Sequence, residues 1–371
     1  MNDLDRRALL RAGTAGLLTM AFPWPGVAAA DDWQAEWART IELAKREGAV
    51  TVSASSNRSR RDFIVREWQK AFPEITISYQ VVNGSRFVPA VVTERRAGKY
   101  LWDVWHSGPP SGLQALHAGL LDPLLPELIL PEVKDPAKWG GWEDAFYDPE
   151  RRYLLGLFND ITAPYYNARN LKPERVQQLG LKILLEPDLK GKIYWVDPRL
   201  SGPGAPYLAL LDHVLGPDNL RRVLIEQDPV FVASENDVAA AIVRGRGLLA
   251  LANRPGEALA EYVTAGLDLD IRSLGNGPEV GYRGTGGGTI GLFNQRPNPN
   301  AARLFVNWIA TREIAVGLSR AQDLNSARLD VPALDARYAA ILGAAYVDGQ
   351  REEHDAIVRR WQKELKTIRP L

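Results

Sequence analysis

The segment AVTVSASSNRSRRDFIVREWQKAFPEITISYQV, residues 49–81, decides the fold. It predicts, in order, a strand over 49–54, a polar loop over 55–59, an amphipathic helix over 60–72 and a strand over 75–81. Downstream, a helix is expected from Gly84 to about Gly98, and a third strand over 103–107. This alternation predicts a parallel sheet with helices on both faces.

The same alternation restarts after a turn-rich middle in which prolines prevent long regular elements. The expected elements are strands over 193–196, 230–232 and 248–252 and helices over 204–215, 235–244 and 299–310. The chain is therefore predicted to be an α/β protein of two lobes, each a mainly parallel sheet flanked by helices. The expected boundaries are 31–157 for lobe 1, 158–282 for lobe 2, and 283–371 for a return to lobe 1 with C-terminal helices.

Composition excludes several classes of function. The chain has 371 residues, with 45 basic and 45 acidic side chains, so no global positive charge favours nucleic acid as a partner. It has no cysteine, which excludes disulfides, thiolate nucleophiles and iron–sulfur clusters. Its four histidines show no metal-ligand spacing, and no nucleophile elbow or phosphate-binding loop occurs. We therefore expect no catalysis, no cofactor and no metal site.

Residues 1–30 have the layout of a bacterial twin-arginine export signal. Arg6 and Arg7 precede a moderately apolar stretch, and Ala28-Ala29-Ala30 offers a cleavage site before Asp31. The apolar run is too short, and too interrupted by proline, to span a bilayer about 30 Å thick. We expect the signal to be cleaved, and the mature protein to be periplasmic and not membrane-spanning.

Several segments, in this order, resemble a known family. They are GKYLWDVWHSG (98–108), APYYNARNLKP (163–173), DLKGKIYWVDPRLSGPG (188–204) and RPNPNAARLFVNWIATRE (296–313). Together they resemble the periplasmic solute-binding proteins of bacterial ABC importers, in the branch that contains the ferric-iron-binding proteins. The resemblance implies a type II-like two-lobed fold, a hinge that the chain crosses more than once, and a ligand clamped in the cleft between the lobes. It also implies a monomer that delivers a small-molecule solute to an inner-membrane permease and its ATPase.

Candidate ligand-binding residues in lobe 1 follow the first and third strands, because ligands of α/β sheets bind at the carboxyl ends of strands. They are Ser55, Ser56, Asn57 and Arg58 after the first strand, and His106 and Ser107 at the end of the third. The loop after the first strand can equally serve as a helix cap with a solvated arginine, and the histidine can equally be a satisfied turn residue.

Candidates in lobe 2 are Tyr166 near the expected crossover, Ser201 and Gly202 before a helix, Glu235 at a helix start, and Arg254 after the last strand. Each has a structural alternative: hinge packing for the tyrosine, a flexible capping loop for the Ser-Gly pair, dipole compensation for the glutamate, and a plain surface charge for the arginine.

One difference between this chain and the ferric-binding members of that family bears on the nature of the solute. These members carry adjacent tyrosines after the strand that corresponds to 248–252, whereas this chain has Asn253-Arg254-Pro255-Gly256. Arg58, Arg199 and Arg254 instead favour an anionic or polar organic solute. Two alternatives stay open: a ferric-iron-binding protein, and a ligand-sensing module that presents to a membrane receptor.

Overall fold

The computed structural model describes residues 33–55, 57–82, 84–252, 256–275, 277–334 and 346–370. The export signal expected over 1–30 lies outside these residues, as do Ser56 and Arg254. Among the described helices, none is both long and apolar enough to cross a membrane.

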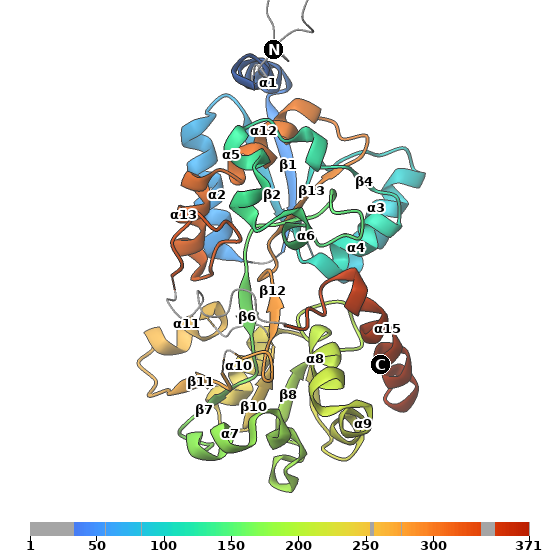
Figure 1. Ribbon diagram of the computed structural model, residues 1–371, viewed down its shortest axis with the longest axis vertical. Helices are drawn as coiled ribbons and strands as arrows, with labels where there is room; N and C mark the ends of the chain where they lie inside the picture. Colours follow the sequence, from blue (N-terminus) through green and yellow to red (C-terminus); the bar gives the residue numbers. More distant parts are fainter. Residues whose placement is uncertain are drawn as a thin grey trace, which may run out of the picture. The chain divides into compact units, whose positions relative to one another are not determined.

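The first lobe opens with the predicted strand–helix alternation (Figure 1). Its elements are α1 (Trp33–Glu47), β1 (Ala49–Ala54), α2 (Arg58–Ala71), β2 (Thr76–Val81), α3 (Gly84–Arg96), β3 (Val104–Ser107) and α4 (Pro109–His117). β1 pairs in parallel with both β2 and β3, which confirms the parallel sheet. The apolar face of α2, including Ile64 and Trp68, is buried against this sheet.

The turn-rich middle contains only short elements. They are β4 (Leu121–Asp122), η1 (Leu125–Glu127), α5 (Pro131–Lys134), η2 (Pro136–Trp139), α6 (Trp142–Ala145) and β5 (Leu155–Gly156). Asp148 holds the chain before β5 in a turn. The Asp148 carboxylate accepts hydrogen bonds from the main-chain N–H groups of Arg152, Tyr153 and Leu154.

The first sheet is completed from the far end of the chain. Its strand order is β2-β1-β3-β13-β4, with β5 also paired to β13 (Thr289–Phe293), and β13 runs antiparallel to its neighbours. α12 (Pro299–Ile309) and α13 (Arg312–Gln322) follow β13, and α13 packs beside α2. Antiparallel pairing sets the start of β13 opposite the carboxyl end of β3, since Thr289 is in register with Ser107.

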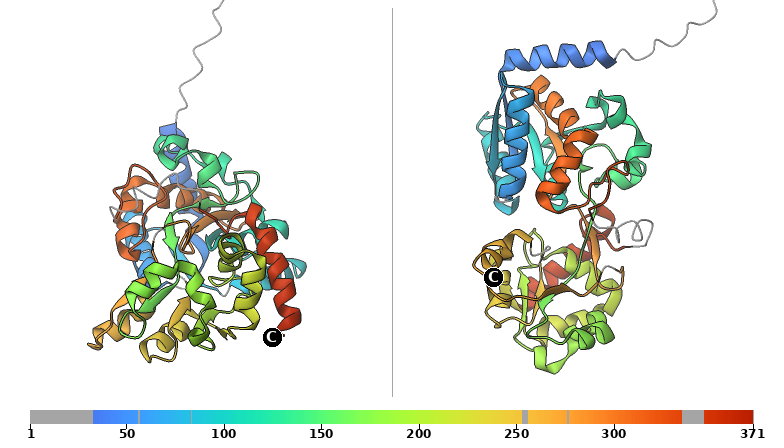
Figure 2. Two further views of the ribbon diagram at one scale, coloured as in Figure 1. Left: turned by 60° about the horizontal axis from the view of Figure 1, so that its bottom comes forward. Right: turned by 90° about the vertical axis from the view of Figure 1, so that its left-hand side faces the viewer.

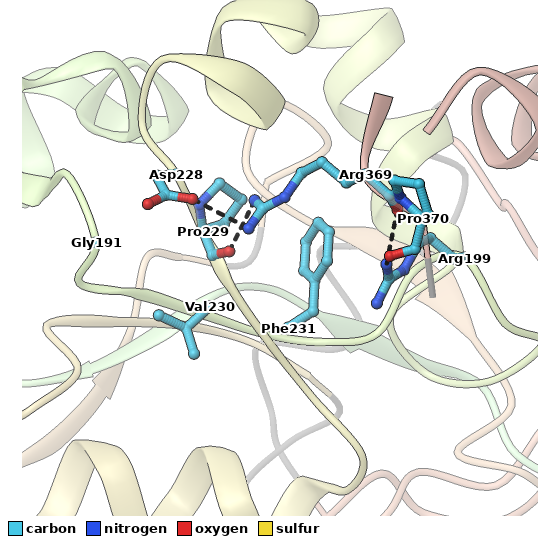
Figure 3. Close-up of a pocket in the computed structure, with 8 residues that line it drawn as sticks. All are labelled: Gly191, Arg199, Asp228, Pro229, Val230, Phe231, Arg369 and Pro370. Carbon is cyan, nitrogen blue, oxygen red and sulfur yellow. Dashed lines mark hydrogen bonds and ion pairs between the residues drawn. The ribbon is translucent and has the colours of Figure 1, made fainter. Parts of the chain in front are cut away.

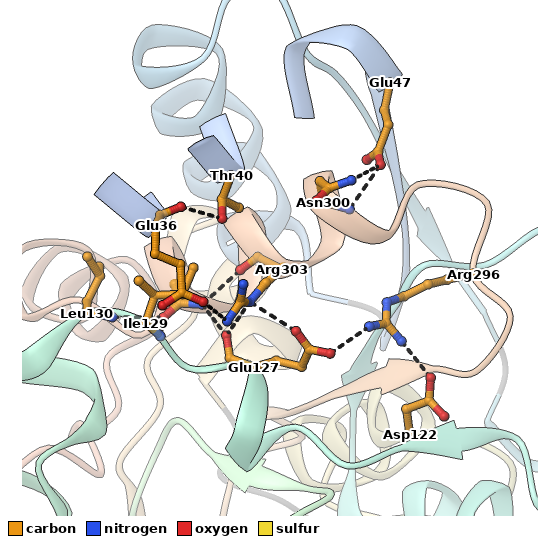
Figure 4. A network of polar contacts seen from close by, with 11 residues as sticks. Glu36, Thr40, Glu47, Asp122, Glu127, Ile129, Leu130, Arg296, Asn300 and Arg303 are labelled. Atoms are coloured by element: carbon orange, nitrogen blue, oxygen red, sulfur yellow. Dashed lines mark hydrogen bonds and ion pairs between the residues drawn. The ribbon is translucent and has the colours of Figure 1, made fainter. Parts of the chain in front are cut away.

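Polar contacts attach α1 to α12, along which it packs (Figures 2 and 4). The Glu47 carboxylate accepts from the side-chain amide of Asn300 and from the Ala301 N–H, which satisfies donors at the start of α12. Arg303 pairs with Glu36 on α1 at 2.7 Å and with Glu127 at 3.0 Å. The amino-terminal helix is therefore part of the first lobe.

The second lobe has its own five-stranded sheet, in the order β11-β7-β10-β8-β9. Its elements are β7 (Tyr165–Asn167), α7 (Pro173–Leu179), η3 (Gly180–Leu185), η4 (Pro187–Leu189), β8 (Ile193–Val196), α8 (Pro206–Leu215), α9 (Pro217–Ile225), β9 (Val230–Val232), α10 (Glu235–Val243), β10 (Leu249–Leu251), α11 (Gly256–Thr264) and β11 (Ile271–Ser273). β8 pairs in parallel with β9 and β10, while β7 is antiparallel to β10 and β11. The two lobes therefore have separate sheets and separate apolar cores.

Two short strands join the sheets. β6 (Asp160–Thr162) leaves the first lobe, β12 (Tyr282–Gly284) returns to it, and they pair antiparallel as a sheet of their own. α15 (Glu352–Ile368) then packs on α8 of the second lobe, with Trp361 buried. The range 283–371 thus contains β13, α12 and α13, which belong to the first lobe, and α15, which packs on the second. The lobe boundaries given from the sequence remain a prediction.

Candidate functional site

The carboxyl edge of the first sheet gathers three loops from distant parts of the chain. Ser55 directly follows β1, Gly108 follows β3, and the loop 285–288 precedes β13. The Ser55 hydroxyl donates to the Gly287 carbonyl oxygen at 3.2 Å. A Cβ added at Gly108 would lie 3.9 Å from the Gly287 Cα, so these backbones run close together. The glycine-rich loop 285–288 is therefore part of this edge.

Arg60 forms hydrogen bonds to two of these loops. Its side chain is buried, and its guanidinium donates to Gln322 Oε1 at 2.8 Å, to the Gly287 carbonyl at 2.8 Å and to the Gly286 carbonyl at 3.2 Å. It also donates to the Ser55 hydroxyl at 3.2 Å. A buried arginine whose donors meet main-chain carbonyls has a positioning role. Arg60 could not be singled out from the sequence, because an arginine among other arginines in a helical turn is expected to face solvent.

His106 and Ser107 end β3 and are both buried. The Tyr79 hydroxyl lies 3.0 Å from His106 Nδ1, and the two rings are nearly perpendicular. Burial, with a smaller contribution from nearby Arg60, holds the His106 pKa well below its usual 6.5, so the imidazole is neutral. The Ser107 carbonyl accepts from Thr289. Both residues thus support the edge from inside the sheet.

Asn57 and Arg58 lie at the start of α2. The Asn57 side chain accepts from the Arg60 N–H at 2.7 Å and so caps the helix. The Arg58 side chain is 83% exposed and lies 3.6 Å from the Asp62 carboxylate, one turn along the helix. The structure brings Ser55 to the Gly287 loop, while Arg58 points to a carboxylate on its own helix.

The carboxyl edge of the second sheet carries the Ser201-Gly202 loop, which follows β8 and leads into α8. This loop is anchored by Gly204, whose carbonyl accepts from the Trp195 indole N–H at 2.9 Å. A Cβ at Gly204 would lie 1.7 Å from the Val196 carbonyl oxygen, so only glycine permits this approach. Ser201 and Gly202 themselves are half-buried at this edge.

Tyr207 joins the loop to the end of β10. Its hydroxyl donates to the Ala252 carbonyl oxygen at 2.8 Å. Glu235, at the start of α10, is close enough to raise the pKa of both Tyr165 and Tyr207, an effect secondary to burial. Tyr165 and Tyr207 are themselves buried, so their rings pack beneath the loops of this edge.

Tyr166 lies elsewhere. Its ring packs in the main apolar core of the second lobe, whereas its neighbour Tyr165 packs with the smaller group that includes Ala252 and Val238. Adjacent residues on a strand point to opposite faces, so the two tyrosines pack on opposite sides of β7. Sequence reasoning chose Tyr166 from a tandem pair, and no signal in the sequence distinguishes the two faces of a three-residue strand.

A cavity of about 640 Å³ lies away from these loops (Figure 3). Gly191 precedes β8 and Asp228 precedes β9, so part of its lining comes from the amino ends of these strands. The Phe231 ring is flanked by Arg199 and Arg369, with guanidinium carbons 5.2 and 4.7 Å from the ring centroid. Arg199 also pairs with Asp197 at 2.7 Å and donates to two C-terminal carbonyls. The Arg199 guanidinium therefore binds Asp197 and the last described residues of the chain. The sequence had instead favoured Arg199 as a cation that binds a solute.

Within the described ranges, no group of three or more His, Asp or Glu side chains is placed to hold a metal ion. The Tyr207 and Tyr282 hydroxyls both donate to main-chain carbonyls, at 2.8 and 3.4 Å. Burial raises the pKa of Tyr207 well above its usual value. A buried phenol that serves as a donor is a poor source of the tyrosinate that ferric iron prefers.

Comparison with solved structures identifies the fold. No family model matches the chain, and no curated protein matches it in sequence. Iron-bound HitA from Pseudomonas aeruginosa is 15% identical with a TM-score of 0.66, covering 85% of this chain and 99% of that one. A substrate-binding protein of an ABC transporter from Agrobacterium tumefaciens is 16% identical (TM-score 0.65; coverage 85% and 94%). AfuA from Actinobacillus pleuropneumoniae, with fructose-6-phosphate bound, is 16% identical (TM-score 0.61; coverage 86% and 99%).

These similarities extend over most of each compared chain, and at this level of identity they show the fold. The chain has the two-lobed α/β fold of the periplasmic binding proteins, as the sequence predicted.

Proposed function

We propose that this protein is the periplasmic solute-binding component of an ABC importer, and that it captures a small anionic or polar organic solute by hinge closure. The observation that carries the proposal is the junction of the two lobes. Two independent sheets are joined by the antiparallel pair β6 and β12, and each sheet carries polar loops at its carboxyl edge. Such a short pair of connecting strands is suited to a hinge motion.

The fold comparison supports a binding protein over an enzyme, because the similar structures named above are binding proteins. It also supports a permease partner and a periplasmic location. The twin-arginine signal over 1–30, its cleavage and a monomeric state belong to the proposal as predictions from the sequence.

The solute class rests on the polar groups at the two edges. The first lobe offers the Ser55 hydroxyl beside the Gly287 loop, and the second offers the half-buried Ser201 on the loop before α8. Hydroxyl and main-chain groups of this kind suit hydrogen-bonding solutes. The bonded phenols of Tyr207 and Tyr282 speak against the ferric-iron alternative.

A thermal-shift screen of the purified full chain tests this function. Compounds are offered as matched pairs: fructose 6-phosphate with fructose, citrate with ferric citrate, and an alkylphosphonate with the corresponding alcohol. A ligand at 100 times its Kd stabilises a protein by about 2.7 kcal/mol, which moves the melting midpoint by a few degrees. We expect a shift with an organic member of the panel, and no additional shift on adding iron.

Variants then locate the site. Ser55→Ala and Ser201→Ala, one in each lobe, should both reduce the shift, because closure brings both edges to one solute. Ser59→Ala, which changes an exposed serine one residue into α2, is the matched control. A shift that survives both site variants, or a shift that only ferric iron produces, would refute the proposed site and solute class respectively.

A further inference from the structure

A third connection between the lobes lies at residues 347–351, which we call the C-terminal latch. This segment immediately precedes α15, and its members are buried. Its five residues contact the first lobe, the β12 strand and the second lobe.

Arg351 makes the contact with the first lobe. Its Nη1 donates to the Glu143 carbonyl oxygen at 2.9 Å and its Nη2 to the Asp144 carbonyl oxygen at 2.6 Å, both in α6. Its guanidinium carbon also lies 4.9 Å from the centroid of the Tyr147 ring. One side chain therefore holds two main-chain carbonyls and an aromatic face, which an arginine fork can do and a lysine ammonium cannot.

Asp348 holds Arg351 in this orientation. Its carboxylate lies 3.3 Å from Arg351 Nε and accepts from the Gln350 N–H at 3.0 Å. The Asp348 and Arg351 side chains are only 3% and 8% exposed. A buried pair of this kind is weak evidence for added stability, but it specifies one geometry, because the alternatives leave a buried charge unpaired.

The latch meets the connecting strand through Gln350 and Val347. Gln350 Oε1 accepts from the Thr285 N–H at 3.1 Å, directly after β12. The Arg283 N–H, within β12, donates to the Val347 carbonyl oxygen at 3.3 Å. β12 is thus bonded on one side to β6 and also to the latch.

Gly349 makes the contact with the second lobe. A Cβ at this position would lie 2.7 Å from the Pro206 Cα and 2.9 Å from the Pro206 carbonyl oxygen. Pro206 is the first residue of α8, which the Ser201-Gly202 loop enters. The close approach that glycine permits therefore places the latch against the helix that carries a candidate solute loop.

We infer that residues 347–351 are a latch that sets the separation of the two lobes, with Arg351 as its positioning residue. Two connecting strands alone leave rotation about the hinge unrestrained, whereas a third contact to α6, β12 and α8 restrains it. The latch thereby controls the population of lobe arrangements that can close on a solute. This effect on capture rests on the proposed function, but the effect on lobe separation does not.

The experiment measures the distance between the lobes directly. The chain has no cysteine, so Gln69→Cys on α2 and Gln178→Cys on α7 take nitroxide labels at two exposed positions without any prior substitution. Double electron–electron resonance then gives the distance distribution in the full chain. Arg351→Met and Arg351→Lys are compared with Arg359→Met, which changes an exposed arginine of α15 whose ion pairs are to Glu352 and Asp355 of the same helix.

We expect both Arg351 variants to shift the mean distance or broaden the distribution about two-fold, and Arg359→Met to leave it unchanged. Arg351→Lys keeps a positive charge beside Asp348, so it decides the matter if Arg351→Met fails to fold. If circular dichroism shows that the Arg351→Lys variant and the parent are both folded, and their distance distributions superimpose, the inference that Arg351 sets the lobe separation is overturned. A failure of every compound in the solute screen would refute the proposed function and leave this result standing.

Discussion

Arg60 Nη1 donates to the Gly287 carbonyl oxygen at 2.8 Å, joining residues 227 positions apart in the chain. This bond ties the start of α2, after the first strand of the lobe, to the loop that precedes its last strand. The same guanidinium reaches the Gly286 carbonyl and the Ser55 hydroxyl. The shape of the first-lobe edge therefore depends on one buried side chain that has no need to touch a solute.

Arg60→Met should lower the free energy of unfolding by about 2–4 kcal/mol, because it leaves buried carbonyls without their donor. It should also abolish the thermal response to any solute found in the screen, since the Gly287 loop loses its support. Urea denaturation measures the first effect. Arg61→Met, at the exposed position next to Arg60, is the control and should change little; equal losses from both variants would contradict the positioning role of Arg60.

His106 should make the protein sensitive to mild acid. Its folded-state pKa is depressed below 6.5, chiefly by burial and then by Arg60, so below that pH the unfolded chain binds a proton that the folded chain does not. The free energy of unfolding therefore falls as the pH falls below about 6.5, by up to about 1.4 kcal/mol per pH unit from this group.

Urea denaturation of the parent and of His106→Asn between pH 7.5 and pH 5 checks this slope. The variant should show a shallower decline, and His213→Asn, at an exposed position on α8, should decline like the parent. Burial raises the pKa of Asp103 and Asp348, so protonation of these carboxylates in more acid solution raises the free energy of unfolding as the pH falls. This contribution is the same in the parent and in both variants, so it does not affect the comparison of their slopes. A His106→Asn slope that equals the parent slope would show that His106 is not the titrating group.

Gly204→Ala should destabilise the second lobe by about 2–4 kcal/mol, because its methyl group would overlap the Val196 carbonyl and backbone cannot move aside as a side chain can. The loop that carries Ser201 and Gly202 would be displaced with it. Gly256→Ala is a suitable control, since no described atom lies within 4 Å of its added Cβ. Thermal unfolding of the two variants should therefore differ; matching midpoints would mean that the loop after β8 adjusts freely.

The strand–helix order was predictable because each element carries its own periodic signal. Ile64 and Trp68 mark the buried face of α2, and the alternating pattern of 75–81 marks β2 within one residue of its observed start. Contacts between distant segments carry no such local signal. The pairing of β13 with β3 and the docking of α15 on α8 depend on surfaces that only the folded lobes create.

The positions of the candidate loops could be predicted better than the residues that shape them. The rule that ligands bind at carboxyl ends of strands led to Ser55 and Ser201, whose loops do lie at those edges. Arg60 and Arg351 escaped notice because a charged group in a sequence does not reveal its burial. Arg58 and Arg199 were favoured as cations, yet the structure pairs them with Asp62 and Asp197.

Ferric iron provides the last test, because it separates the two solute classes by chemistry. We expect that adding ferric citrate produces no visible absorption band beyond that of ferric citrate itself, since a tyrosinate–iron band requires a deprotonated phenol. Forming that phenolate at Tyr207 would break its bond to the Ala252 carbonyl and place a negative charge in a buried site near Glu235. A coloured complex that Tyr207→Phe abolishes, and that Tyr262→Phe retains, would reverse this conclusion and establish iron binding through the second-lobe tyrosine. A colour that neither substitution removes would place the metal on other ligands and would equally contradict an organic solute as the sole ligand.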